Sequence, residues 1–134
     1  MTSFPLKIVT PDGLIFDGEA EELIVRSITG EVAVLAKHTN FVTPLGMGRA
    51  TIVSGGQRRT AACIGGMLSV VNGSVTLVPT TFEWSDKIDL DRANAAYQRA
   101  NDILNNPRST ENDLKLAEAK LRRALVRRSV ASSK

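Results

Sequence analysis

Aromatic residues, cysteine and histidine are scarce in this chain of 134 residues. Phe, Trp and Tyr make up only 4% of it, so a hydrophobic core has to be built from Val, Ile, Leu and Ala. The single cysteine, Cys63, cannot form an internal disulfide, and its apolar neighbours predict a buried thiol in a reducing compartment. With one histidine, His38, the sequence offers no His/Cys cluster with the spacing of metal ligands.

Long apolar runs and catalytic signatures are also missing. No run approaches the roughly 20 apolar residues that span a bilayer, and the N-terminus does not read as a signal peptide. There is no G-x-x-x-x-G-K-[ST] phosphate loop and no G-x-S-x-G nucleophile motif. His38 has no partner in its sequence neighbourhood, which favours a hydrogen-bonded loop histidine over a catalytic base. We therefore expect a non-catalytic chain, either cytosolic or held at a membrane only by partners.

Charge is unevenly distributed along the chain. Residues 1–86 hold six basic and eight acidic residues, a net charge of −2, whereas residues 87–134 hold 11 and six, a net charge of +5. Any anionic partner should therefore bind the C-terminal third.

The first 80 or so residues show short apolar runs separated by turn signals such as Pro11-Asp12-Gly13, Gly55-Gly56 and Asn72-Gly73. Turns every 8–12 residues are typical of an all-β sandwich or barrel. Asn72-Gly73 predicts a tight hairpin over residues 67–78, because both positions tolerate positive φ. Residues 58–64 become apolar on both faces, which predicts a central strand between two sheets.

After residue 86 the apolar period changes to that of a helix. Asn105-Asn106-Pro107 should end a first helix, and Thr110 with Asp113 resembles a capping box that opens a second. The predicted apolar stripes are Ala93, Ala96 or Tyr97, Ala100, Ile103 or Leu104 on the first helix and Leu114, Ala117, Leu121, Ala124 or Leu125 on the second. These alanine-rich stripes predict an antiparallel helical hairpin that buries little apolar area and can move.

Arginines in the two predicted helices share a side. Arg92 and Arg99 lie seven residues apart, about 20° apart around one helix, and Arg123 and Arg127 lie one turn apart on the other. Folded together, four guanidinium groups could converge on one anion, with Asp89 accepting from a base or sugar hydroxyl. The alternative is a solvated basic face on which Asp89 only complements the helix dipole, and spacing alone favours this simpler interpretation.

The whole chain resembles the epsilon subunits of bacterial rotary F-type ATP synthases. The resemblance lies in the order and spacing of VTPDGLIFDGEAEEL, GEVAVLAKHTNFVTPL, GGMLSVVNGSVTLV, IDLDRA and LAEAKLRRALVRRSV. It implies an α+β chain in which residues 1–86 form a ten-stranded β-sandwich and residues 87–134 form an antiparallel two-helix hairpin.

The resemblance also implies a role. Such a chain is a non-catalytic rotor subunit of a proton- or sodium-driven synthase, peripheral to the cytoplasmic face of the bacterial plasma membrane. Its sandwich would contact the gamma subunit and the c-ring through a loop region that carries Glu31 and His38. Ala33 and Lys37 depart from the glycines that are common at these positions. The hairpin would extend among the alpha and beta subunits and block ATP hydrolysis, or fold back beside the sandwich.

Some family members bind ATP in the folded hairpin through an I/L-D-x-x-R-A motif and further arginines. The matching residues here are Ile88, Asp89, Arg92 and Ala93 in the motif, Arg99, Arg123 and Arg127 after it, and Glu83 before it. ATP would then be a regulatory ligand, with no cofactor required and the presence of Mg²⁺ left open. Leu116 replaces an arginine of an ATP-binding relative, which predicts an affinity lower by about one to two decades.

Two rival functions follow from the basic tail. A small nucleic-acid-binding module is disfavoured by the few aromatic residues and the acidic N-terminal part. A hairpin lying on anionic membrane is disfavoured because its apolar face lacks Trp and Phe anchors.

Overall fold

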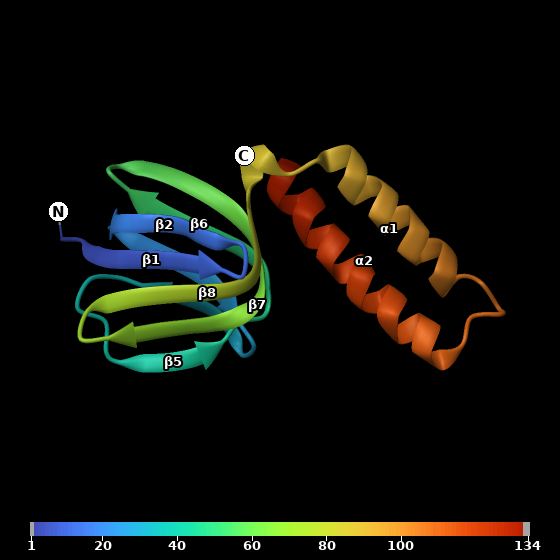
Figure 1. The fold of residues 1–134 in the computed structure, drawn as a ribbon, viewed down its shortest axis with the longest axis horizontal. Helices are drawn as coiled ribbons and strands as arrows, with labels where there is room; N and C mark the ends of the chain where they lie inside the picture. The colour runs from blue at the N-terminus through green and yellow to red at the C-terminus, as the bar shows by residue number, and fades with distance from the viewer. Residues whose placement is uncertain (1, 133–134) are drawn as a thin grey trace. The chain divides into compact units, whose positions relative to one another are not determined.

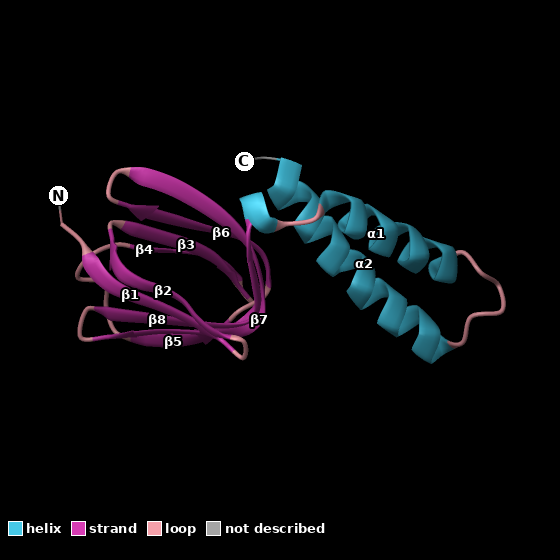
Figure 2. Ribbon diagram, turned by 45° about the horizontal axis from the view of Figure 1, so that its top comes forward, coloured by secondary structure: helices cyan, strands magenta, loops and turns pink. Residues whose placement is uncertain are grey.

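The computed structural model describes residues 2–132 of the chain. The chain divides into two compact units, Met1–Trp84 and Ser85–Lys134. The first is a β-sandwich and the second a pair of packed helices (Figures 1 and 2). The boundary predicted from the sequence, after residue 86, lies two residues beyond this division.

Eight strands build the sandwich, in the sheet order β2-β1-β8-β7-β6-β3-β4, with β5 also pairing with β7. All neighbours are antiparallel except β1 and β8, which are parallel. The strands are β1 Phe4–Thr10, β2 Gly13–Ala20, β3 Glu22–Ser27, β4 Gly30–Val34, β5 Phe41–Pro44, β6 Met47–Ser54, β7 Gln57–Val71 and β8 Ser74–Trp84.

The ten strands expected from the resemblance are eight continuous strands here, because β7 and β8 are shared between the two layers. The first half of β7 pairs with β6 and the end of β8, and its second half pairs with β5 and the start of β8. The passage between the halves lies at Gly65 and Gly66, which have φ of 68° and 101°. If β7 and β8 were each divided at this bend, the sandwich would have ten strand segments. The expected and observed strand counts therefore differ only in whether these two strands are counted as continuous.

The predicted hairpin and the predicted central strand are both confirmed. Val71 pairs with Ser74, so Asn72 and Gly73 form a two-residue turn, with φ of 50° and 81°. Both values fall in the left-handed region that such a turn requires. Residues 61–64 are buried, and β7 lies between β6 and β8 at these positions.

The core of the sandwich is aliphatic, as the shortage of aromatic residues requires. Its largest fully buried side chains include Leu6, Ile8, Leu23, Ile52 and Leu68. Cys63 is part of this core, and burial raises the pKa of its thiol from 9.0 to about 12. The thiol is therefore protonated and unreactive at neutral pH.

The raised pKa of Cys63 predicts that the sandwich loses stability in alkali. The unfolded thiol loses its proton near pH 9 and the folded one only near pH 12, so deprotonation favours the unfolded chain in between. We expect the free energy of unfolding to fall by about 1.4 kcal/mol per pH unit across this window. Urea unfolding from pH 8 to 11 measures it. Cys63→Ala is the control, and equal slopes for both proteins would contradict the prediction.

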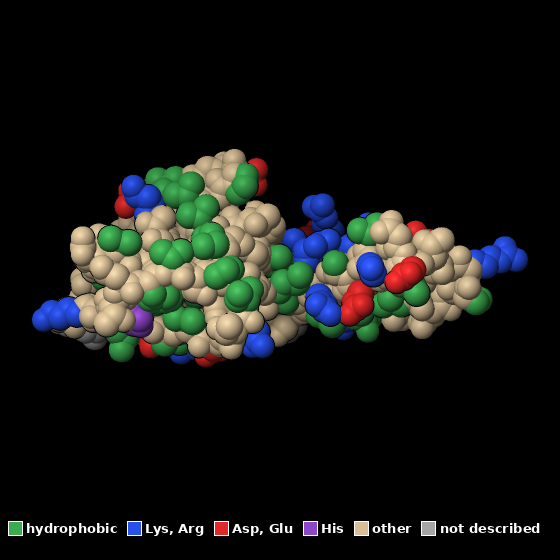
Figure 3. All heavy atoms as spheres, turned by 90° about the horizontal axis from the view of Figure 1, so that it is seen from below, with side chains coloured by type: hydrophobic (Ala, Val, Ile, Leu, Met, Phe, Trp, Pro, Cys, Tyr) green, Lys and Arg blue, Asp and Glu red, His purple; other side chains and the backbone are tan. Residues whose placement is uncertain are grey.

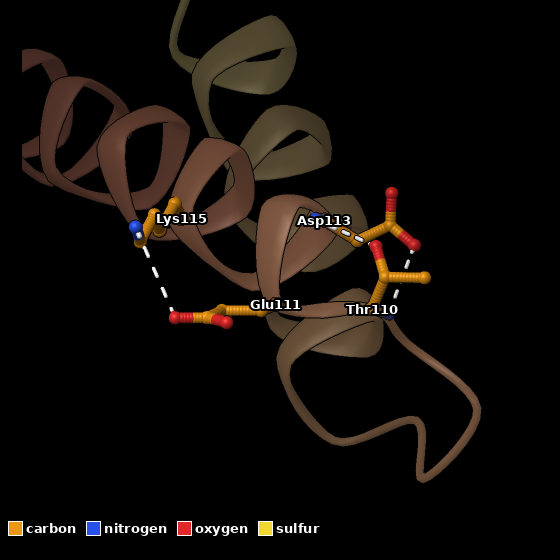
Figure 4. Close-up of polar contacts among 4 residues, drawn as sticks. All are labelled: Thr110, Glu111, Asp113 and Lys115. Carbon is orange, nitrogen blue, oxygen red and sulfur yellow. Dashed lines mark hydrogen bonds and ion pairs between the residues drawn. The ribbon is translucent and has the colours of Figure 1, made fainter.

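The second unit contains a short 3-10 helix, η1 Ser85–Lys87, and two α-helices, α1 Leu90–Leu104 and α2 Glu111–Ser132. As predicted, α1 ends before Asn105-Asn106-Pro107. The predicted capping box is also present (Figure 4): Thr110 N–H donates to Asp113 Oδ2 and Asp113 N–H donates to Thr110 Oγ1, both at 3.1 Å. These two bonds fix the start of α2.

Alanines form the contact between the two helices. Ala93 and Ala100 on α1 and Ala117 and Ala124 on α2 are each at most 3% exposed and recur at seven-residue spacing. We call these four residues the alanine seam. Of the predicted stripe on α2, Ala117 is buried and Leu121 is half-buried, whereas Leu114 is 37% exposed. Of the predicted alternatives Ala124 and Leu125, Ala124 is the buried one and Leu125 is 44% exposed.

Candidate functional site

Four arginines lie on one side of the helical hairpin, and we call them the arginine face: Arg92, Arg99, Arg123 and Arg127. Arg92, Arg99 and Arg123 each precede an alanine of the seam by one position. Because α1 and α2 run antiparallel, positions that precede the seam on either helix fall on the same side of the pair. Arg127 lies one turn after Arg123 and shares its side. The structure thus brings the predicted arginines onto one face.

Three of the four arginines on this face lack an acidic partner among residues 2–132. Two ion pairs join neighbouring turns of α2, Lys115–Glu111 at 3.9 Å and Arg122–Glu118 at 2.6 Å. Arg92, Arg99 and Arg123 have no carboxylate within salt-bridge distance in residues 2–132. Three positive charges concentrated on one side, without acidic partners, favour an anionic ligand.

Asp89 is the N-cap of α1. Its backbone is extended, with φ −82° and ψ 101°, and its Oδ1 accepts a hydrogen bond of 3.0 Å from the Arg92 backbone N–H. Asp89 therefore stabilises the start of α1, in line with the simpler of the two interpretations of the sequence. Capping uses one carboxylate oxygen, and the other has no partner among the residues that the structure describes.

The other residues predicted to bind ATP, Ile88, Ala93 and Glu83, are buried or already engaged in contacts within the fold. Ile88 and Ala93 are 8% and 3% exposed, so their side chains pack inside the protein. Glu83 belongs to β8 in the sandwich, where it pairs with Ala62, which in turn pairs with Arg49 of β6. Glu83 is half-buried and already engaged in interactions within the fold.

Glu31 and His38 lie near opposite ends of β4 and are not brought together. Glu31 is the second residue of β4, is exposed, and pairs with Arg26 across the sheet. His38 follows the strand, with its Nδ1 2.9 Å from the Thr39 carbonyl oxygen and its ring 4.9 Å from that of Phe41. Between them, Lys37 has a φ of 65°, which explains why glycine suits this position.

One contact that joins the two helices has no signal in the local sequence. The Arg128 guanidinium lies over the Tyr97 ring, 4.5 Å from its centroid. From the sequence, Tyr97 was predicted only as a member of the apolar stripe of the first helix. No local sequence pattern links it to Arg128, which lies 31 positions later. This cation–π contact adds to the weak adhesion of the alanine seam.

Comparison with known proteins decides the family. Residues 3–85 match the model of the ATP synthase Delta/Epsilon chain beta-sandwich domain, and residues 86–132 match that of its long alpha-helix domain. The chain is 40% identical to the ATP synthase epsilon chain of Bacillus pumilus over 98% of both chains. It belongs to the ATP synthase epsilon-chain family. The epsilon chain of Exiguobacterium is 38% identical over 100% of this chain and 99% of its own length.

An ATP synthase epsilon chain is a non-catalytic subunit of the central stalk. Two solved structures share the fold at low identity. One is titled as the Euglena gracilis mitochondrial ATP synthase, with 22% identity, a TM-score of 0.80, and coverage of 91% of this chain and 77% of the other. The second, from the Tetrahymena thermophila mitochondrial enzyme, has 12% identity, a TM-score of 0.64 and coverage of 95% of both chains.

Among residues 2–132, no helix has the length and apolarity that a bilayer crossing demands. The same range contains no group of three or more His, Cys, Asp or Glu side chains arranged to hold a metal ion.

Proposed function

We propose that this epsilon chain is a rotor subunit whose sandwich joins the gamma subunit to the c-ring and whose hairpin regulates ATP hydrolysis. The folded hairpin binds ATP, and the extended hairpin enters the alpha and beta subunits and blocks hydrolysis. The observation that carries the regulatory part is the arginine face, with three guanidinium groups that lack acidic partners in the described chain.

An exposed apolar surface on the sandwich supports the rotor role. Ile28 donates its backbone N–H to Pro44, and Pro44, Met67 and Val78 are paired in a row across β5, β7 and β8. Ile28 is 65% exposed, and Val42 of the adjacent row is 60% exposed. Figure 3 views the β5 side and shows hydrophobic side chains over much of the sandwich. An apolar surface of this kind is typical of a protein interface.

The partner of this surface would be the gamma subunit, and Glu31 and His38 would contact the c-ring. The two similar solved structures both include a c-ring, and one of them is of a central stalk with its c-ring. This assembly would hold the chain at the cytoplasmic face of the bacterial plasma membrane as a peripheral subunit.

The chemistry of the arginine face suits a triphosphate. Guanidinium groups donate paired hydrogen bonds to phosphate oxygens, and the open oxygen of Asp89 can accept from the base or a ribose hydroxyl. Because the arginines come from both helices, ATP would bind the folded hairpin and stabilise it by mass action. Leu116 offers no hydrogen-bond donor, so the affinity should be lower than in relatives with arginine there.

Calorimetric titration of the isolated protein with ATP tests the regulatory part. We expect binding by the wild type, and a loss of about tenfold or more for Arg92→Ala and Asp89→Ala, because each removes a charge-assisted contact. Arg122→Ala is the matched control, since Arg122 is paired with Glu118 and lies off the arginine face. No heat from the wild type at millimolar ATP, or an equal loss for Arg122→Ala, would refute the site.

A further inference from the structure

At the end of the hairpin farthest from η1 there is a half-open surface pocket of about 350 Å³, and none of the arginine-face residues lines it. It lies between the end of α1, the connecting loop and the first turns of α2. Its lining residues are Ile103, Asn106, Arg108, Ser109, Asp113, Leu116, Ala117 and Lys120. The volume falls in the range of small-molecule sites. We call it the tip cavity.

The loop that forms the tip cavity is held by its own hydrogen bonds. Asn106 Oδ1 accepts from the Arg108 backbone N–H at 2.9 Å, and Ser109 Oγ donates to the Ile103 carbonyl oxygen at 2.6 Å. The capping box of Thr110 and Asp113 fixes the other side. The cavity is thus pre-formed in the folded hairpin, which lowers the entropic cost of binding a ligand.

The lining of the tip cavity combines two cations with an apolar wall. Arg108 and Lys120 have no carboxylate within salt-bridge distance in residues 2–132. Asp113 offsets one of their charges and already accepts from the Thr110 N–H, so the lining carries a net charge of +1. Ile103 and Leu116, 38% and 54% exposed, form the apolar wall with Ala117. One surplus positive charge beside apolar surface suits a monovalent anion with a short apolar group.

We infer that the tip cavity binds a small organic carboxylate, with its carboxylate on Arg108 and Lys120 and its alkyl chain against Ile103 and Leu116. Ile103 comes from α1, whereas Leu116 and Lys120 come from α2, so the cavity exists only while the hairpin is folded. Its ligand therefore stabilises the folded hairpin by mass action. If the arginine face binds ATP as proposed, ATP and the ligand of the tip cavity bind cooperatively, because both select the folded hairpin.

Hexanoate is a suitable probe, followed by backbone amide chemical shifts of the full chain without ATP. We expect shifts confined to residues 103–120 that saturate at millimolar hexanoate, and a loss of affinity of about fivefold or more in Lys120→Ala and Arg108→Ala. Lys115→Ala is the matched control, because Lys115 is on the same helix and is paired with Glu111. Hexylammonium has the same alkyl chain and the opposite charge, and should cause no such shifts.

Three results would overturn the tip-cavity site: no shifts with hexanoate, equal shifts with hexylammonium, or unchanged affinity in both cavity variants. Inorganic phosphate separates an organic acid from a plain anion, and equal or tighter binding of phosphate would refute the assignment to a carboxylate. Because this experiment contains no ATP, a negative result does not test ATP binding by the arginine face. A negative ATP titration likewise does not test the tip cavity.

Discussion

Replacing Gly66 with alanine is expected to destabilise the sandwich severely. A Cβ atom at this position would lie 2.6 Å from Pro79 Cα and in contact with the Val78 carbonyl oxygen. Both obstacles are backbone atoms of β8 that hydrogen bonding holds in place, so neither can turn away as a side chain can. The φ of 101° at Gly66 adds strain for any L-residue. Together we expect a loss of more than about 4 kcal/mol in unfolding free energy.

Urea unfolding of the full chain followed by circular dichroism measures this loss. Gly55→Ala is the matched control: its φ of 60° is also left-handed, but nothing lies within 4 Å of an added Cβ. The control should lose only about 1–2 kcal/mol, the usual cost of left-handed backbone. A similar loss in both variants would mean that backbone strain, and not the close approach of β8, makes glycine necessary at Gly66.

Removing residues 87–134 is expected to release ATP hydrolysis in the assembled complex while leaving the sandwich folded. The core of the sandwich, from Phe4 to Phe82, contains no residue of the hairpin. The truncated chain keeps the whole exposed apolar surface that we assign to the gamma subunit. It should therefore still assemble, and ATPase activity should rise several-fold because the inhibitory segment is gone.

The measurement is ATP hydrolysis by complexes reconstituted with full-length or truncated chain, at verified and equal incorporation. ATP synthesis driven by an ion gradient is the control and should change little, since inhibition is proposed for hydrolysis alone. Unchanged hydrolysis would refute an inhibitory hairpin. Failure of the truncated chain to assemble would instead show that the hairpin contributes to stalk binding.

Local signals predicted the fold well where one residue type decides the geometry. Asn72-Gly73 fixed a turn, and Thr110 with Asp113 fixed a helix start, because each acts over two to four residues. In the sequence, Gly65-Gly66 resembles the turn signals that separate strands, such as Gly55-Gly56. The structure instead makes it a bend inside β7, because the pairing with β8 keeps its register on both sides of the glycines. Whether a strand ends or bends depends on distant partners, and local sequence does not specify those.

The candidate site, like the fold, was predicted from the sequence only where local pattern decides the geometry. Helical periodicity placed Arg92 and Arg99 on one side of α1, and Arg123 and Arg127 on one side of α2. Their alignment across the hairpin depends on which residues of the two helices meet, and the alanine seam sets this register. The tip cavity could not be predicted, since it is formed by a loop conformation and by side chains from both helices.

If the hairpin regulates hydrolysis as proposed, the alanine seam makes that regulation easy to change in evolution. Each seam side chain is a single methyl group, so its loss in an Ala→Gly change weakens helix adhesion by about 0.8 kcal/mol. That is close to a fourfold change in the ratio of folded to extended hairpin. Under the proposed function, a substitution in the seam would shift the ATP level at which hydrolysis is inhibited, while the arginine face stays the same. Sensitivity would then depend on the seam and ligand recognition on the arginine face, so selection could adjust them separately.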